Sequence, residues 1–314
     1  MEAYNRCDFG TAMMEFDAAI EEWPDTAYSH FATRSSAAVA GVLHQTKDTS
    51  KVVARFDALP SSCQANLLAD YPKDRPRISE LRDANIAAGL PSVAVITQGK
   101  SASMPVQNIF SSGFELPSFA YSIVHLEVVG SWARDFARGG ACYTTHLRPL
   151  RRNVARLKEA HVDKIIVHVR DPRQRLLSMI HHVLRYSDAG VNLKNNSFAD
   201  LSISEQIEAL IEFYTESIWW LQSWLRAAEE LDIHFSTFKD FVTDRESFIQ
   251  GYIDYYGHES LFSYEKATTL PGSIDDRYRA GQIDEWRRKF PPDDIARLND
   301  LLPDFIKERF GWTD

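Results

Sequence analysis

The chain has 314 residues, of which 44% are apolar and 25% are charged, so it has enough material for a packed core and is not globally disordered. Acidic residues outnumber basic ones by 44 to 35, and the net charge of −9 argues against a general nucleic-acid or anionic-membrane binder. The sequence has no signal-peptide pattern, no apolar run of about 18 residues and only three widely spaced cysteines, so we expect a cytoplasmic protein without membrane segment, disulfide framework or metal knuckle.

The first 90 residues are expected to be a helical region. Ala12, Phe16, Ala19 and Pro24 have spacings that resemble the second helix of a tetratricopeptide repeat. We find one such unit, whereas about three repeats are needed to bury one another's faces. An ordinary helical hairpin packed on the main domain is the alternative. In either case these helices are a candidate surface for a protein partner.

Beyond residue 90 the pattern predicts strands that alternate with helices. Apolar, β-branched runs predict buried strands at 93–97, 123–129, 164–169 and 233–235. Helices are expected at 149–160, at 172–185 and, after a capping box formed by Ser202 and Glu205, in one long segment. Its tryptophans are expected to pack the helix: Trp219, Trp220 and Trp224. The alternation predicts an α/β domain over 91–314, with a central parallel sheet flanked by helices and ligands at the carboxyl ends of the strands.

The first candidate for chemistry is the loop at 97–103, directly after the strand 93–97. Its small residues let backbone N–H groups close around a phosphate, the following helix adds its dipole, and Lys100 adds a point charge. A Walker A loop would need a glycine five positions before Gly99, where Ala94 stands, so a nucleotide-triphosphatase is disfavoured. A plain surface turn is the alternative.

The second candidate is Arg170, which follows the strand 164–169 and offers a rigid fork of donors suited to phosphate. Ser178 comes eight residues later, two turns into the next helix, where its hydroxyl could share that phosphate. A solvated helix face explains part of the local excess of basic residues but not an arginine at the end of a buried strand. A third basic segment lies at 277–290.

In chain order these segments resemble the PAPS-dependent sulfotransferase family. Residues 98–104 resemble its 5′-phosphosulfate loop, usually PKSGTT, and 167–178 resemble its 3′-phosphate element, an apolar strand followed by RDP and a serine. Residues 144–147 look like the KTHLP segment that carries the catalytic histidine, and 279–290 are similar to the late RKG loop.

The resemblance implies the P-loop-like sulfotransferase fold and transfer of a sulfuryl group from PAPS to an acceptor hydroxyl or amine, without a metal. The acceptor would be a small molecule or a carbohydrate, and PAP would be the second product. His146 would be the general base and Lys100 would stabilise the leaving phosphate. The 5′-phosphate would lie on Lys100, Ser101, Ala102, Ser103 and Met104. The 3′-phosphate would lie on Arg170, Ser178, Arg279, Ala280 and Gly281.

The chain departs from the family pattern in several places and leaves three alternatives open. Ala102 replaces a glycine, Ala280 a lysine, and Thr144 the lysine before the Thr-His pair. Glu127, at another predicted strand end, is the substitute base. A P-loop kinase-like phosphotransferase would also use Lys100, and a catalytically silent nucleotide-binding or scaffold module would fit the two alanines.

Overall fold

Five parallel strands form one sheet in the order β2–β3–β1–β4–β5 within the described residues. The computed structural model describes residues 75–119, 128, 130–162, 164–185, 197–268 and 282–313, without the side chains of 75–79, 118–119 and 130–132. The strands are β1 (Val93–Thr97), β2 (Ser118–Phe119), β3 (Cys142–Thr145), β4 (Lys164–Val169) and β5 (Asp232–Thr237).

The strands β1 and β4 confirm the predicted 93–97 and 164–169. Every residue of β1 is buried, and so is every residue of β4 after Lys164. Successive side chains point to opposite faces, so Val93 and Val95 enter one hydrophobic core while Ala94 and Ile96 enter the other. Burial on both faces explains why these segments are continuous apolar runs rather than alternating ones.

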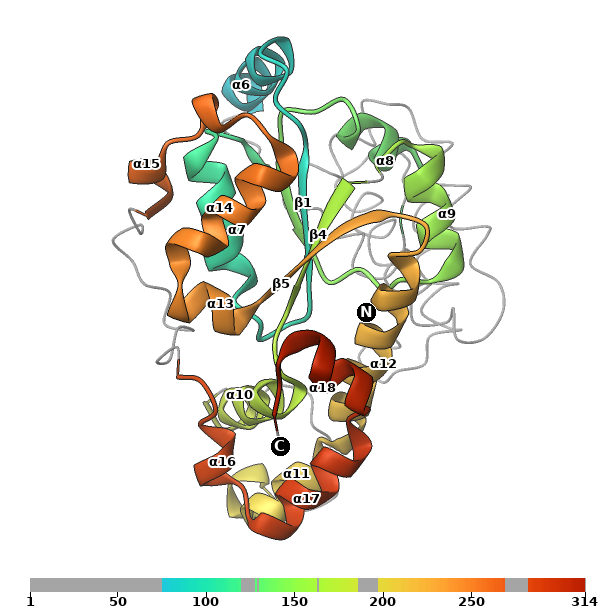
Figure 1. Ribbon diagram of the computed structural model, residues 1–314, viewed down its shortest axis with the longest axis vertical. Coiled ribbons are helices and arrows are strands. Elements are labelled where there is room, and N and C mark those ends of the chain that lie inside the picture. Colours follow the sequence, from blue (N-terminus) through green and yellow to red (C-terminus); the bar gives the residue numbers. More distant parts are fainter. Residues whose placement is uncertain are drawn as a thin grey trace, which may run out of the picture.

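Helices cover both faces of the sheet (Figure 1). One face carries α7 (Ser103–Gly113), α13 (Phe238–Thr243), α14 (Arg245–Tyr256) and α15 (Tyr264–Thr268). The other carries α8 (Gly130–Phe136), α9 (Arg151–Glu159) and α12 (Ile211–Ala227). Below the sheet, in the view of Figure 1, lie α10 (Pro172–Arg185), α11 (Ile203–Ala209), α16 (Trp286–Lys289), α17 (Pro292–Leu301) and α18 (Asp304–Phe310). The helix α6 (Arg75–Ala87) lies at the opposite end, and two 3-10 turns span Phe198–Asp200 and Glu259–Leu261.

The predicted long helix after residue 202 is divided into two. The capping box of Ser202 and Glu205 is present and begins α11. Leu210 then leaves the helical conformation, with φ −113° and ψ 14°, and α12 starts at the next residue. Trp220 and Trp224 pack the helix as expected, but Trp219 is 40% exposed, which corrects the prediction for that residue.

The other predicted elements have mixed outcomes. The helices predicted at 149–160 and 172–185 are α9 and α10. The strand predicted at 233–235 is the centre of β5, whereas the short strands β2 and β3 were not predicted. Of the strand predicted at 123–129, the structure describes Val128, which is buried outside any strand. Residues 1–74, with the tetratricopeptide-like unit, lie outside the described residues. None of the described helices is both long and apolar enough to cross a membrane.

Candidate functional site

The loop after β1 has an unusual backbone that leads directly into α7. Lys100 has φ +71° and Ala102 has φ +62°, so both adopt the left-handed conformation that non-glycine residues rarely take. Ala102 is the N-cap of α7 and makes no side-chain cap, so the first N–H groups of the helix have no capping side chain. Alternating left-handed residues before a helix N-terminus form the kind of concavity that binds anions.

Two arginines from distant segments hold the carbonyl groups of this loop. Nε of Arg175, on α10, donates to the Gly99 carbonyl oxygen at 2.8 Å. Nη1 of Arg170, directly after β4, donates to the Lys100 carbonyl oxygen at 2.7 Å. Because β1 and β4 are parallel neighbours, their carboxyl ends meet at one edge of the sheet, and the loop after β1 lies against the arginines that follow β4.

His146 reaches the same loop from the end of β3, on the other side of β1. Its Nδ1 lies 2.8 Å from the Thr97 carbonyl oxygen. A carbonyl can only accept a hydrogen bond, so Nδ1 must carry the proton, and a neutral ring then presents the lone pair of Nε2. A Cβ built on Gly99 would lie 3.9 Å from that Nε2, so the histidine lies beside the 97–103 loop.

The structure therefore brings together the predicted residues of three segments: the 97–103 loop, His146 and Arg170. Of the residues expected on the 5′-phosphate, Ser101 is fully buried, Ser103 begins α7 and Met104 is 51% exposed. Ser178 is half-buried on α10. It lies four residues after Gln174 and three after Arg175, on the helix face that meets the site.

Arg170 lies against an aromatic ring and a small cavity. Its guanidinium carbon is 4.0 Å from the centre of the Phe238 ring, at the start of α13. A cavity of about 40 Å³ lies beside it, lined among others by Gln174, Lys239 and Trp312. The carboxyl edge of the sheet thus holds a recess with two basic side chains, Arg170 and Lys239, two acidic ones, Asp171 and Asp284, and the aromatic rings of Phe238 and Trp312.

The described chain resumes at Gln282, inside the third predicted segment, 277–290. The side chain of Gln174 donates to the Gln282 carbonyl oxygen at 3.1 Å and accepts from the Glu285 amide at 3.1 Å. Gln282 therefore lies at the first turn of α10. Arg279, Ala280 and Gly281, the predicted 3′-phosphate residues of this segment, and Glu127, the substitute base, lie outside the described residues.

The next basic residue after Arg170, Arg173, has a structural role. It is fully buried, and its guanidinium donates to both carboxylate oxygens of Asp171 and to the Thr313 carbonyl oxygen. It also contacts Asn299 at 2.7 Å and lies 4.2 Å from the Trp286 ring centre. These contacts tie the corner after β4 to the C-terminal helices.

Sequence reasoning missed two buried groups beneath the loop, Arg175 and His168. Burial lowers the pKa of Arg175 to about 9, with Glu216 opposing this shift and Arg170 adding to it. Burial also lowers the pKa of His168 to about 3, so the ring is neutral, and its Nδ1 is 2.9 Å from Ser236 Oγ. A polar residue inside the apolar run 164–169 was the available signal for His168. Arg175 has no comparable signal, because a basic residue near a helix start is ordinarily solvated.

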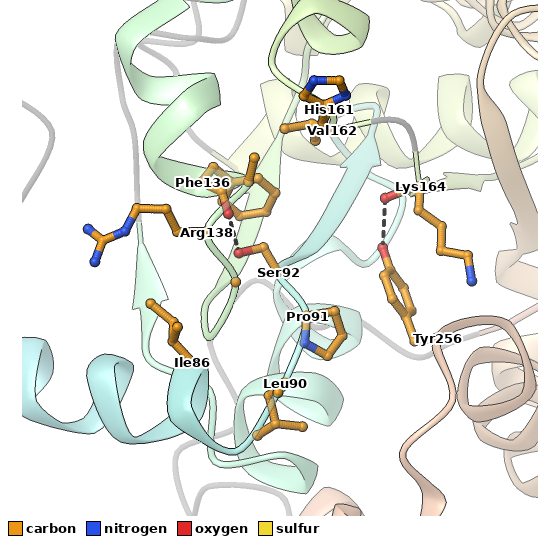
Figure 2. A pocket seen from close by; sticks show the side chains of 13 residues that line it. Ile86, Leu90, Pro91, Ser92, Phe136, Arg138, His161, Val162, Lys164 and Tyr256 are labelled. Atoms are coloured by element: carbon orange, nitrogen blue, oxygen red, sulfur yellow. Dashed lines mark hydrogen bonds between the residues drawn. The ribbon is translucent and has the colours of Figure 1, made fainter.

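A larger cavity, of about 330 Å³, lies at the opposite edge of the sheet (Figure 2). It is lined by residues that precede β1 and β3, among them Ser92 and Arg138, and by Lys164 at the start of β4. None of the predicted site residues lines this cavity. We place the candidate site at the carboxyl edge despite its smaller hollow, because the backbone strain and the convergent cations are there.

The residues at the carboxyl edge suit an anionic ligand such as a phosphate group. The Ser101 hydroxyl is buried and has no hydrogen-bond partner in the part of the chain that the structure describes, as expected of a group that a ligand oxygen satisfies. Lys100, Arg170 and Arg175 add cations around the loop. Within the described ranges no three His, Cys, Asp or Glu side chains come together as metal ligands.

Comparison with known proteins gives three findings. No curated protein matches the chain. Among the 36 solved chains that match is the crystal structure of mouse sulfotransferase SULT7A1 complexed with PAP, with 13% sequence identity, coverage of 71% of this chain and 88% of that chain, and a TM-score of 0.48. The family model described as Sulfotransferase domain matches residues 142–308, which include His146, Arg170 and Ser178 but not the 97–103 loop. This match spans more than half of the chain, and the protein therefore belongs to the sulfotransferase domain family.

Proposed function

We propose that this sulfotransferase transfers a sulfuryl group from PAPS to a hydroxyl or amine of a small-molecule or carbohydrate acceptor, with His146 as the general base. The observation that carries the proposal is the meeting of three segments at one edge of the sheet. His146 contacts the carbonyl of Thr97 and Arg170 contacts that of Lys100, so the base, the loop and the arginine form one site.

The loop and the arginine divide the binding of the two phosphates between them. Backbone N–H groups at 101–104 and the side chain of Lys100 would hold the 5′-phosphate, with Lys100 stabilising the charge that develops on it. Arg170 and Ser178 would hold the 3′-phosphate, together with Arg279, Ala280 and Gly281. PAPS, when bound, supplies the activated sulfuryl group. The protein contributes position and charge rather than covalent chemistry.

His146 would remove the acceptor proton at Nε2. Because Nδ1 donates to the Thr97 carbonyl, the ring is oriented and its tautomer is set before the acceptor binds. On this side of the site α12 lies alongside the chain that follows β3: Trp220 Nε1 donates to the Leu147 carbonyl at 2.9 Å, and Arg148 pairs with Glu216. We therefore expect the acceptor between His146 and α12. The cytoplasmic location and the protein partner of the N-terminal helices stay predictions.

Ligand-induced thermal stabilisation distinguishes the proposal from its two alternatives. We expect PAP to raise the melting temperature at low concentration, and ATP with Mg²⁺ to have no such effect. Stabilisation by ATP with Mg²⁺ alone would favour the phosphotransferase that uses Lys100. Stabilisation by PAP without formation of PAP from PAPS, across a panel of phenols, alcohols, sugars and amines, would favour a silent nucleotide-binding module.

The His146→Ala variant separates chemistry from binding. We expect turnover to fall by about 10² to 10⁴-fold, the usual contribution of a positioned general base, with unchanged affinity for PAP. The matched control is His161→Asn, at the opposite edge of the sheet, where asparagine suits the φ of +60°. Equal loss of PAP affinity and turnover in His146→Ala would make this histidine structural.

A further inference from the structure

Arg175 is a buried cation that touches the phosphate loop from behind. Besides its bond to the Gly99 carbonyl, its Nη1 donates to the Ser217 hydroxyl and to the Phe213 carbonyl oxygen at 3.4 Å. Its guanidinium carbon lies 3.8 Å from the centre of the Phe213 ring. The side chain is therefore fixed between α10, where it originates, and α12, and it reaches the loop with one N–H.

Among the described residues, no ion pair balances the positive charge of Arg175. No carboxylate lies within ion-pairing distance of it among the described residues, and the nearby Glu216 pairs with Arg148 instead. A buried charge without a partner is costly, so its retention needs a compensating interaction. Within the described residues, the guanidinium donates to two main-chain carbonyls, that of Phe213 on α12 and that of Gly99 in the loop.

The two loop arginines hold the peptide groups on either side of Lys100. The Gly99 carbonyl belongs to the peptide that contains the Lys100 N–H, and the Lys100 carbonyl belongs to the peptide that contains the Ser101 N–H. In a trans peptide the N–H points opposite to the C=O, so both amides point away from the arginines. Lys100 itself has φ +71°, a conformation that persists only where its surroundings impose it.

We infer that Arg175 is a positioning residue, which holds the Gly99–Lys100 peptide and thereby directs Lys100 and the loop amides toward the 5′-phosphate. The inference rests on the proposed function of the site. A donor on the carbonyl end of a peptide polarises its N–H, so the buried charge also strengthens the hydrogen bond that the Lys100 amide offers to an anion. The bound phosphate would then be the compensating partner of Arg175, one peptide group away.

The affinity contributed by the 5′-phosphate tests this role. The probes are PAP and adenosine 3′-phosphate, which lacks the 5′-phosphate, and the readout is the ratio of their dissociation constants by calorimetry. We expect Arg175→Gln to reduce the advantage of PAP roughly tenfold, as when one charge-assisted hydrogen bond is lost, with little change for adenosine 3′-phosphate. Arg175→Lys, which keeps the charge and one donor, should restore part of the advantage.

The matched control is Arg82→Gln. Arg82 is also buried and also donates to main-chain carbonyls, those of Gly139 at 3.2 Å and Asp135 at 2.5 Å, but it lies at the opposite edge of the sheet. Its loss should lower stability and leave the ratio of the two dissociation constants unchanged. A ratio for Arg175→Gln within twofold of the wild-type ratio would overturn the inference. If Arg175→Gln does not fold, Ser217→Ala, which removes one anchor of the guanidinium, should lower the ratio by a few-fold, and an unchanged ratio would overturn it.

Inorganic pyrophosphate separates this inference from the proposed function. If the wild type binds pyrophosphate but neither nucleotide, and Arg175→Gln weakens pyrophosphate roughly tenfold, the proposed function fails while the role of Arg175 in an anion cradle stands. If pyrophosphate binds equally to both proteins, the inference fails. A wild type that binds none of the three probes would contradict both proposals.

Discussion

The parallel sheet has an amino edge, where its strands begin, and a carboxyl edge, where they end. Residues with positive φ occur at both edges but in different settings. At the amino edge, left-handed residues close helices: Gly89 follows α6, Glu115 follows α7 and His161 follows α9. Helix ends commonly take this conformation at small cost. At the carboxyl edge, Lys100 and Ala102 adopt it in front of a helix, where no helix end requires it. These positive φ values therefore close helices at the amino edge, whereas at Lys100 and Ala102 they shape the loop that we propose binds an anion.

Buried arginines at the two edges differ in whether a carboxylate of the fold balances their charge. At the amino edge, Nη1 of Arg82 pairs with the Asp135 carboxylate at 2.6 Å, so its charge is balanced within the fold. At the carboxyl edge, Arg175 is buried without a described carboxylate partner and contacts the loop. The charge of Arg82 is compensated inside the fold, whereas we propose that a bound anion compensates the charge of Arg175.

The largest effect is expected on turnover, from Lys100→Met. Lys100 is proposed to stabilise the negative charge that develops on the leaving phosphate. Loss of its ammonium group should therefore reduce turnover by about 10² to 10³-fold. The control is Lys164→Met at the amino edge, where Lys164 donates to the Tyr255 carbonyl, and its turnover should match the wild type. Steady-state formation of PAP from PAPS measures both. Comparable losses in the two variants would remove the distinction between the edges.

The second-largest effect is expected from Gly139→Ala, at the amino edge, which should lower the stability of the protein. Gly139 has φ +100°, and an added Cβ would lie 2.6 Å from the Leu90 carbonyl oxygen. Backbone must move to make room, so the free energy of unfolding should fall by about 2 to 3 kcal/mol, with PAP affinity retained. Urea unfolding and PAP titration measure the two quantities. A variant of wild-type stability would show that this turn is not tightly packed.

A third effect appears on acidification, through His168. Its pKa of about 3 in the fold lies below the value of about 6.5 expected for the unfolded chain, so between these pH values the unfolded state binds the extra proton. Stability should therefore fall as the pH drops through 6.5, by about 2 kcal/mol between pH 8 and pH 5, and level off below pH 3.

The His168→Gln variant isolates this contribution. Urea unfolding at pH 8 and pH 5 should give a smaller loss for the variant than for the wild type, by the same ~2 kcal/mol. The pKa of His234 is also lowered by burial, but this histidine is present in both proteins and cancels in the difference. Identical losses in the two proteins would mean that His168 is not held neutral in the fold.

The smallest effect is expected from Ala102→Gly, at the carboxyl edge. Alanine at φ +62° and ψ 35° is strained, and glycine removes the strain, so stability should rise by about 1 kcal/mol. The change in the free energy of unfolding thus has the opposite sign to the change expected for Gly139→Ala. A less stable Ala102→Gly protein would show that the conformation of the loop imposes no strain on alanine.

The sequence was informative where local pattern decides the structure. Continuous β-branched runs identified β1 and β4, and the capping box identified the start of α11. The strand β3 was not predicted, because its four residues, which include two threonines, form no long apolar run. The break at Leu210 was not predicted, because the apolar residues keep a helical spacing on both sides of it.

The sequence predicted the motifs that carry the candidate site, but not the residues that hold those motifs in place. Lys100, His146 and Arg170 lie in recognisable segments, and the structure brings those segments together. Arg170, Arg173 and Arg175 are alike in sequence, yet one lies at the recess, one ties the C-terminus and one holds the loop. Those roles depend on contacts across as many as 140 residues of chain, which no local pattern encodes.

A crystal structure with PAP bound would show which of the two cavities, one at each edge of the sheet, is the nucleotide site. We expect one phosphate on the loop around Lys100 and the other at Arg170, with His146 beside the open 5′ end. PAP in the cavity between Arg138 and Lys164, at the amino edge, would contradict this expectation.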